Sequence, residues 1–193
     1  MSLEDLRDKL ITRLTHDQTE LPLDEQPYLN NWNAKSLHRQ LARFTHWLEE
    51  QSRQPGRYLE YIVRSGKNAY EIEHLWANHF ERHTDEFAHA QEFSAHRNRM
   101  GGLILLPKKI NASLNDKAYS DKLEHYQSEN LLARSLHPMC YVHNPGFLKL
   151  KDETGLPFKA FTEFKKANFE ERFNLYKGIA ELLWSADRLK EVA

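Results

Sequence analysis

The sequence is poor in residues that cross-link a chain or embed it in a membrane. It contains one cysteine, Cys140, so no intrachain disulfide can form, which fits a reducing cytosol. Its apolar runs are all far shorter than the roughly 20 residues that a membrane-spanning helix needs. The charged, amphipathic start "MSLEDLRDKLITRL" does not have the apolar region of a signal peptide. These features predict a cytoplasmic protein without a membrane partner.

The sequence also lacks a strong excess of charge of one sign. The formal net charge is −1, whereas a free-standing nucleic-acid-binding domain is usually basic. The charge is unevenly distributed, however, because residues 96–122 carry six basic and two acidic side chains, a local charge of +4 that leaves −5 for the rest of the chain. A local basic patch of this kind can face phosphate, and a solvated surface is the alternative interpretation.

Helical periodicity accounts for most of the chain, whose 193 residues suffice for one ordinary domain. One helix is expected over residues 2–14, where leucines recur on one face, and another over residues 35–53. The intervening stretch, residues 17–34, is rich in Pro, Asn and Asp and is expected to form a loop. A long final helix is expected from residue 168. The N-terminal and C-terminal parts of the chain are therefore predicted to be helical.

Two short strands are expected between these helical parts. Residues 69–75, "AYEIEHL", alternate apolar and polar positions, and residues 101–107, "GGLILLP", form an apolar run between helix breakers. Residues 108–137 are expected to begin as a loop and to continue as one or two helices. The predicted fold class is mainly α with a small embedded β-hairpin.

The pair Glu73-His74 at the end of the first predicted strand is the strongest chemical feature. A zinc protease would need His-Glu-x-x-His on one helix, and here the order is reversed. A zinc site built from His79 and His83, four residues apart, is a second interpretation. A third is metal-assisted phosphodiester hydrolysis, in which a neutral histidine deprotonates water and a hard cation stabilises charge on phosphate. That chemistry needs an oxygen ligand near the histidine.

The residues that follow can supply the rest of such a site. The stretches "EIEH", "RNRMGGLILL" and "INASLNDKAYSDK" come in the order strand, strand and helix. Asn111 is a neutral polar residue near the expected start of the helix, and Asn115 is its rival as an oxygen ligand. Asn98 precedes the second strand, where Gly101 and Gly102 permit a tight turn.

These stretches resemble the His-Me finger (HNH) nucleases, in which two short strands and a helix hold one metal ion. More closely, "YEIEHL", "NRMGGLILLPKKINASLNDKAYSDKLEHY" and "ERFNLYKGIAELLW" resemble the C-terminal nuclease domain of GmrSD-type, modification-dependent (type IV) restriction endonucleases. The resemblance is strongest over residues 70–126. It implies a ββα-metal nuclease core over residues 67–137, between helices at 1–66 and 138–193, in a single domain spanning 1–193.

The resemblance also implies a role for each matching residue. His74 matches the general base, and Glu73 the acidic metal ligand before it. Asn111 matches the residue that completes the metal site, and Asn98 the one that braces the loop. Two further positions, Lys122 and Tyr126, match a lysine and an aromatic residue after the motif. Candidate contacts to phosphate are Arg99, Lys108, Lys109 and Lys122.

Two positions depart from the family pattern. Gly101-Gly102 stands where the family usually has Gly-Asn, and Trp76-Ala77 stands where it tends to have a proline after the histidine. Neither departure removes a proposed ligand, but both allow an altered geometry or a reduced activity.

The resemblance as a whole implies a DNA endonuclease of a restriction system that uses one divalent ion, Mg²⁺ or Mn²⁺. The sequence contains no Gly-rich phosphate-binding loop, so the nucleotide-dependent sensor of modified DNA is expected in an N-terminal domain or a separate subunit. Two other classes remain open: a catalytically weak nucleic-acid-binding module and a helical interaction module. The sequence leaves RNA open as a substrate.

Overall fold

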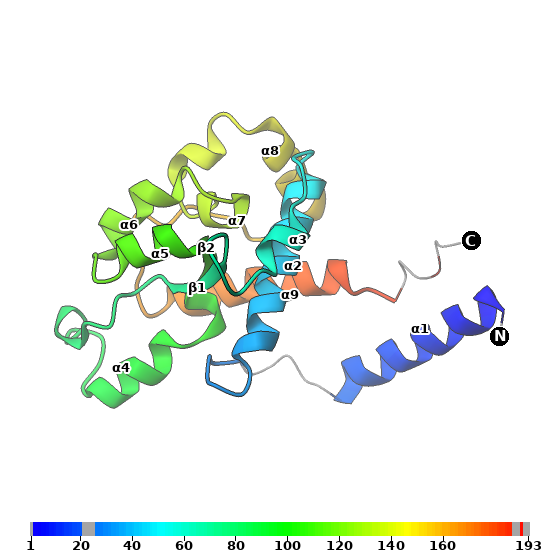
Figure 1. Cartoon of the computed structure of the whole chain (residues 1–193), viewed down its shortest axis with the longest axis horizontal. Coiled ribbons are helices and arrows are strands. Elements are labelled where there is room, and N and C mark those ends of the chain that lie inside the picture. Colours follow the sequence, from blue (N-terminus) through cyan, green and yellow to red (C-terminus); the bar gives the residue numbers. More distant parts are fainter. Residues whose placement is uncertain (1, 21–25, 187–189, 191–193) are drawn as a thin grey trace.

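The computed structural model describes residues 2–20, 26–186 and 190. Within these residues the chain is mainly helical, with one small antiparallel sheet near its middle (Figure 1), which confirms the predicted fold class at this level. The ββα-metal core and the division of the chain at residues 66 and 137 stay predictions.

The helices are α1 (Leu3–Glu20), α2 (Ala34–Gln51), α3 (Tyr58–Tyr61), α4 (Ala90–Arg97), α5 (Lys108–Leu114), α6 (Tyr119–Tyr126), α7 (Leu131–Arg134), α8 (Pro145–Thr154) and α9 (Asn168–Leu183). The strands are β1 (Tyr70–His74) and β2 (Leu103–Pro107), and the short 3₁₀ helices are η1 (Phe80–Arg82), η2 (Met100–Gly102) and η3 (Pro138–Tyr141).

The sheet pairs β1 with β2 in antiparallel register, from Tyr70 opposite Pro107 to His74 opposite Leu103. The second edge of β2 is closed by side chains. Asn130 Nδ2 donates to Leu105 O at 2.7 Å, and a tyrosine hydroxyl from α9 donates to Leu103 O at 2.7 Å. Two carbonyl groups of β2 therefore have side-chain partners in addition to the pairing with β1, and β1 forms the outer edge of the sheet.

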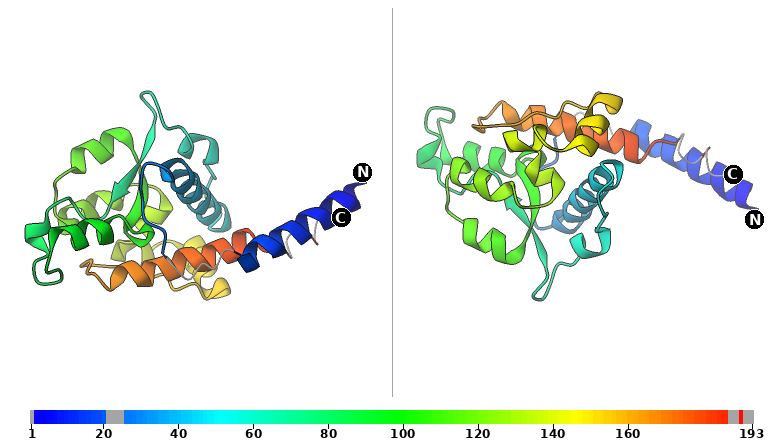
Figure 2. Two further views of the ribbon diagram at one scale, coloured as in Figure 1. Left: turned by 90° about the horizontal axis from the view of Figure 1, so that it is seen from below. Right: turned by 90° about the horizontal axis from the view of Figure 1, so that it is seen from above.

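β2 separates two hydrophobic cores. Leu103 and Leu105 pack into one core with α2 and α9, whereas Ile104 and Leu106 pack into the other, which surrounds Trp76. A strand buried on both faces reads as a continuous apolar run, and this explains why "LILL" was recognisable as a buried strand. In both views of Figure 2, α9 (orange to red) is a long straight helix that runs along one side of the molecule.

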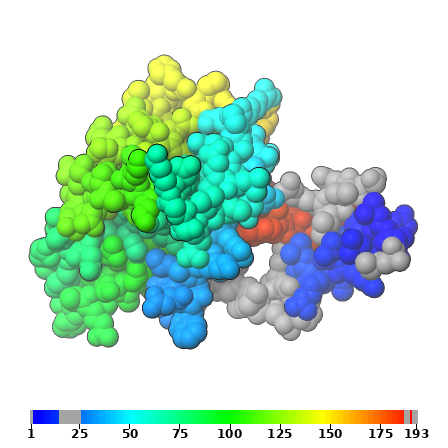
Figure 3. Space-filling model, viewed as in Figure 1, coloured from blue at the N-terminus to red at the C-terminus, as the bar shows by residue number. Residues whose placement is uncertain are grey.

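The first predicted loop is wrong at its start, because α1 continues to Glu20 rather than ending before residue 17. Residues 21–25 of that loop lie outside the described part. The leucines predicted to share a face do so on the surface: Leu3, Leu6 and Leu10 are 64%, 39% and 47% exposed. Figure 3 shows α1 as a projection beside the main body. Within the described residues, no helix is long and apolar enough to cross a membrane.

Candidate active site

His74 lies at the end of β1 and is held by Asn98, the residue that follows α4. Asn98 Oδ1 lies 2.8 Å from His74 Nε2, while Asn98 Nδ2 donates to Ser94 O at 3.1 Å. Because this second bond turns the amide oxygen toward the ring, Nε2 carries the imidazole proton. The lone pair is then on Nδ1, the nitrogen that can accept a proton.

The surroundings of His74 keep its ring neutral. Burial, together with the nearby positive charges of Arg97 and Lys122, lowers the pKa of His74 to about 4, against the opposing effect of the Asn98 hydrogen bond. At neutral pH, the imidazole is therefore in its unprotonated form. A general base needs this form, so the protonation state suits the role that the resemblance implies.

The residues after His74 fix the end of the strand. Leu75 N donates to Gly102 O at 2.9 Å, and the indole of Trp76 donates to Phe164 O at 2.8 Å. Trp76 is 2% exposed, and its carbonyl accepts a 2.8 Å bond from Arg97 Nε. The Trp76 side chain and backbone therefore fix the chain just after His74, where members of the family tend to have a proline.

Glu73 points into a buried polar cluster. Its Oε1 accepts bonds from Lys122 Nζ at 2.7 Å and Tyr126 Oη at 3.0 Å. Lys122 is 1% exposed and also donates to His74 O at 2.8 Å. Burial and the Glu73 charge raise the pKa of Tyr126, which keeps its hydroxyl protonated as a donor. Metal ligation by Glu73 and phosphate contact by Lys122 stay predictions, and each would require this cluster to open.

Asn111 lies opposite a different carboxylate, that of Glu71. Asn111 Nδ2 donates to Glu71 Oε2 at 3.0 Å, and Lys108 Nζ lies 3.6 Å from Glu71 Oε1. The sequence-based reasoning did not single out Glu71. The available signal was the two-residue repeat, since Glu71 and Glu73 lie on the same face of β1 and both can meet the helices that cover it.

The expected loop after the second strand is wrong, because α5 begins at Lys108, directly after β2. Asn111 therefore lies within this helix, on the side that meets β1. Asn115 follows the helix as its C-terminal cap residue and is exposed. The structure thus brings Asn111, rather than its rival, to the strand that carries His74.

The predicted phosphate-binding residues differ in exposure. Arg99 and Lys109 are exposed, and the Lys108 side chain is 57% exposed although it pairs with Glu71. Lys122 is buried, as described above. Three of the four cations can therefore meet an external anion without rearrangement.

The donor atoms around β1 fit a hard divalent cation better than zinc. The carboxylate of Glu71 and the amide of Asn111 offer oxygen ligands, and Mg²⁺ commonly binds one or two protein oxygens and keeps several waters. No group of three or more His, Cys, Asp or Glu side chains that could hold a metal occurs in the described part of the chain. The two histidines of the zinc interpretation have separate partners, His79 with Glu81 and His83 with Trp76.

The Gly101-Gly102 pair has a packing reason. A Cβ at Gly101 would lie 2.0 Å from Phe169 O, and one at Gly102 would lie 2.1 Å from the Phe169 ring. The start of α9 therefore occupies the space that an asparagine at position 102 would need. The amide that contacts His74 comes from Asn98 instead.

Comparison with known proteins identifies the family. A family model described as "GmrSD restriction endonucleases, C-terminal domain" matches residues 10–176. Comparisons with curated proteins and with solved structures find no match. The match contains the whole sheet and the residues that surround His74, and it ends within α9, so this chain belongs to the family of GmrSD restriction endonuclease C-terminal domains.

Proposed function

We propose that this chain is the nuclease module of a restriction system and hydrolyses DNA phosphodiester bonds with the help of one divalent cation, Mg²⁺ or Mn²⁺. The family match supports the nuclease and its DNA substrate. An N-terminal domain or a partner subunit, driven by nucleotide, is the proposed sensor that delivers modified DNA. The single observation that carries the proposal is the neutral His74, held in one tautomer by Asn98.

In the proposed reaction, His74 Nδ1 takes a proton from the attacking water. Asn98 keeps the other ring nitrogen protonated, so the acceptor nitrogen stays available through the reaction. Burial, aided by the charges of Arg97 and Lys122, holds the pKa of His74 low, which suppresses protonation of the base at neutral pH. The positive charge of Arg97, which is partly exposed, favours the approach of a phosphate to this end of β1.

We further propose that Glu71 and Asn111 hold the cation. When bound, such an ion stabilises the negative charge that develops on the phosphate and on the leaving oxygen. Glu71 supports this assignment because its carboxylate is partly exposed and lies next to the Asn111 amide, whose rotation would turn Oδ1 instead of Nδ2 toward the ion. Glu73, the ligand expected from the sequence, is the alternative, and its buried bonds to Lys122 and Tyr126 argue for a structural role.

Three exposed cations are proposed to hold the DNA backbone. Arg99 follows the residue that contacts His74, and Lys108 and Lys109 begin the helix that carries Asn111. Arg99 lies near the end of β1 that carries His74, whereas Lys108 lies at the start of the strand, where its N donates to Ala69 O at 2.8 Å, so a DNA backbone that runs along β1 would meet both. Contacts of this type supply affinity and register rather than sequence preference.

The test is nicking of supercoiled plasmid by the purified protein in Mn²⁺, in Mg²⁺ and in EDTA. We expect nicking only with metal, and we expect His74→Ala to slow it by about 100-fold or more, the usual effect of losing a general base. His143→Ala, which removes an exposed histidine elsewhere, is the matched control and should retain full activity. Wild-type protein that never nicks, or a fully active His74→Ala variant that is folded by circular dichroism, would contradict the proposal.

A further inference from the structure

Trp32 is almost completely exposed to solvent although tryptophan is usually largely buried. Its exposed fraction is 97%. The turn that carries it is nevertheless well ordered by side chains. Asn30 Oδ1 accepts bonds from Trp32 N at 2.9 Å and Asn33 N at 3.1 Å, and Asn33 Oδ1 accepts one from Asn30 N at 2.9 Å. These three hydrogen bonds fix the turn in a conformation that leaves the Trp32 indole exposed to solvent.

This turn is attached to the candidate active site. Leu29 N donates to Asn98 O at 2.7 Å, and Met100 N donates to Pro27 O at 2.8 Å. Tyr28, itself 59% exposed, forms a β-bridge with Arg99. The segment before Trp32 is thus bonded to the residue that orients His74 and to its two successors.

A pocket of about 520 Å³ lies between this segment, the start of α2 and the outer edge of β1. Asn98 and Glu71, both parts of the candidate site, line it. So does His38, whose Nε2 donates to Tyr70 O at 2.9 Å and whose Nδ1 is a buried acceptor without a partner in the described part of the chain. The pocket therefore extends from the turn that carries Trp32 to Glu71 and Asn98 of the candidate site.

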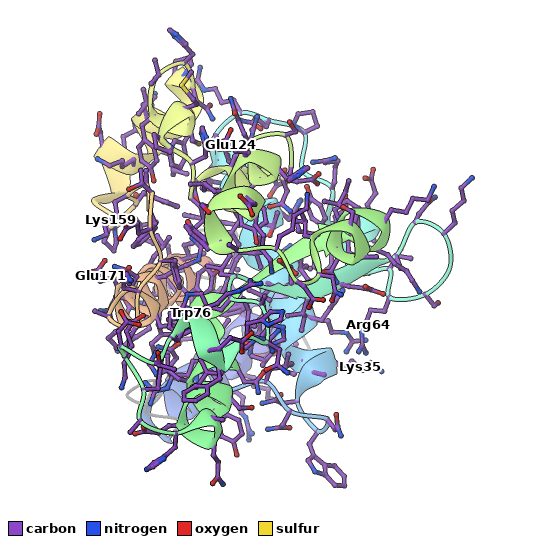
Figure 4. All side chains as sticks on the ribbon, turned by 90° about the vertical axis from the view of Figure 1, so that its left-hand side faces the viewer. Lys35, Arg64, Trp76, Glu124, Lys159 and Glu171 are labelled. Carbon is purple, nitrogen blue, oxygen red and sulfur yellow. The ribbon has the colours of Figure 1, made fainter. Side chains whose placement is uncertain are left out.

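Beside the acidic Glu71, basic side chains lie in and around the pocket. Lys35 and Arg64 are exposed, and both are labelled on the same side of the view in Figure 4. Arg64 lines the pocket, and Arg99 is exposed beside Tyr28. Exposed aromatic rings among cations are the usual composition of a surface that binds unpaired bases, since the rings stack on bases and the cations follow the phosphates.

We propose that Trp32 is a stacking platform for an unpaired nucleobase next to the phosphate that His74 attacks, with Arg64 and Lys35 holding the adjoining backbone. This inference rests on the proposed function, since it deepens the substrate class of the same site. It means that the module prefers DNA with an unpaired or extruded base beside the cut. Trp32 is then a residue that determines substrate preference and touches no reacting atom.

The test measures DNA binding in EDTA, where no cleavage occurs. Two fluorescein-labelled DNAs of equal length are compared by anisotropy, one fully paired and one with a short central run of unpaired thymidines. We expect wild type to prefer the second DNA. Trp32→Ala should weaken that binding by about 5- to 100-fold, the loss that removal of one base–aromatic stack causes, and should change binding of the paired DNA by less than about twofold.

Two variants make the result specific to stacking. Trp32→Phe keeps a ring and should retain most of the preference. Val142→Ala removes a side chain that is 53% exposed on another part of the surface and should change neither affinity. Equal affinities of wild type for the two DNAs, or an equal loss on both in Trp32→Ala, would overturn the inference. The proposed nuclease function is judged separately by nicking in Mn²⁺, so either idea can fail while the other stands.

Discussion

Two carboxylates on one strand, Glu71 and Glu73, have opposite surroundings. Both belong to β1 and face the same side of the sheet. Glu73 is 4% exposed and bonded to Lys122 and Tyr126, whereas Glu71 is partly exposed and shares its oxygens between Asn111 and Lys108. The difference shows that the helix covering each residue, rather than the residue type, decides whether a carboxylate supports the fold or remains available to a ligand.

The helices explain this difference. α6 presents Lys122 and Tyr126 one turn apart to the end of β1, and the buried ammonium also binds the backbone carbonyl of His74. α5 presents Lys108 and Asn111 to Glu71, the second residue of the strand, at the surface. A buried ion pair is costly to break because one charge is left unpaired in the interior, while a surface pair contributes little.

The largest expected effect is on stability, and it separates the two lysines. Lys122→Met leaves Glu73 unpaired in the interior, so the free energy of unfolding should fall by about 3–5 kcal/mol. Lys108→Met removes a pair whose lysine is 57% exposed and should change it by less than about 1 kcal/mol. Urea unfolding followed by circular dichroism measures both. Equal losses in the two variants would show that the buried and surface carboxylates do not differ in the way described.

Much of this arrangement was visible in the sequence. The buried strand "LILL" was predicted because an apolar run between breakers has few other interpretations, and its burial on both faces confirms that. The sequence placed His74, Asn98 and Asn111 in three stretches that come in the order strand, strand and helix. In the structure, Asn98 contacts His74 and Asn111 contacts another residue of β1. These features depend on local pattern and on chain order.

What the sequence could not reveal depends on distant contacts. The partners of Glu73 lie 49 and 53 residues further along the chain, so no local pattern distinguishes it from Glu71. The exposure of Trp32 is likewise set by a turn whose docking onto residues 98–100 joins segments far apart in sequence. Asn115 remained a rival of the favoured Asn111 because the helix start was expected later than Lys108, where it occurs.

The second prediction concerns His74, which follows Glu73 at the end of β1. Burial lowers its pKa from 6.5 to about 4, so between these pH values the unfolded chain binds a proton that the folded protein does not. The free energy of unfolding is therefore unaffected by protonation of His74 above about pH 6.5, and it falls by about 3 kcal/mol as the pH drops from 6.5 toward 4. Urea unfolding at several pH values should show this loss.

A variant isolates the contribution of His74 from that of His96, whose pKa burial also lowers to about 4. His74→Gln should flatten the decline between pH 6.5 and 4 without abolishing it, because His96 still takes up a proton on unfolding. An unchanged slope would mean that the His74 ring titrates alike in the folded and unfolded states, and the proposed base would then lack its enforced neutral form.

The smallest expected effect, and the sharpest test of the comparison, exchanges each carboxylate for its amide. Glu71→Gln should weaken Mn²⁺ binding by about 10- to 100-fold and slow nicking accordingly, while unfolding stays within about 0.5 kcal/mol of wild type because the side chain is at the surface. Glu73→Gln should do the reverse, lowering stability because Lys122 loses its counter-charge and leaving Mn²⁺ affinity near that of wild type. Calorimetric titration with Mn²⁺ on the folded variants reads the affinity directly. If Glu73→Gln loses the ion and Glu71→Gln keeps it, the buried carboxylate is the ligand that the sequence predicted, and the cluster around Lys122 must open to admit the metal.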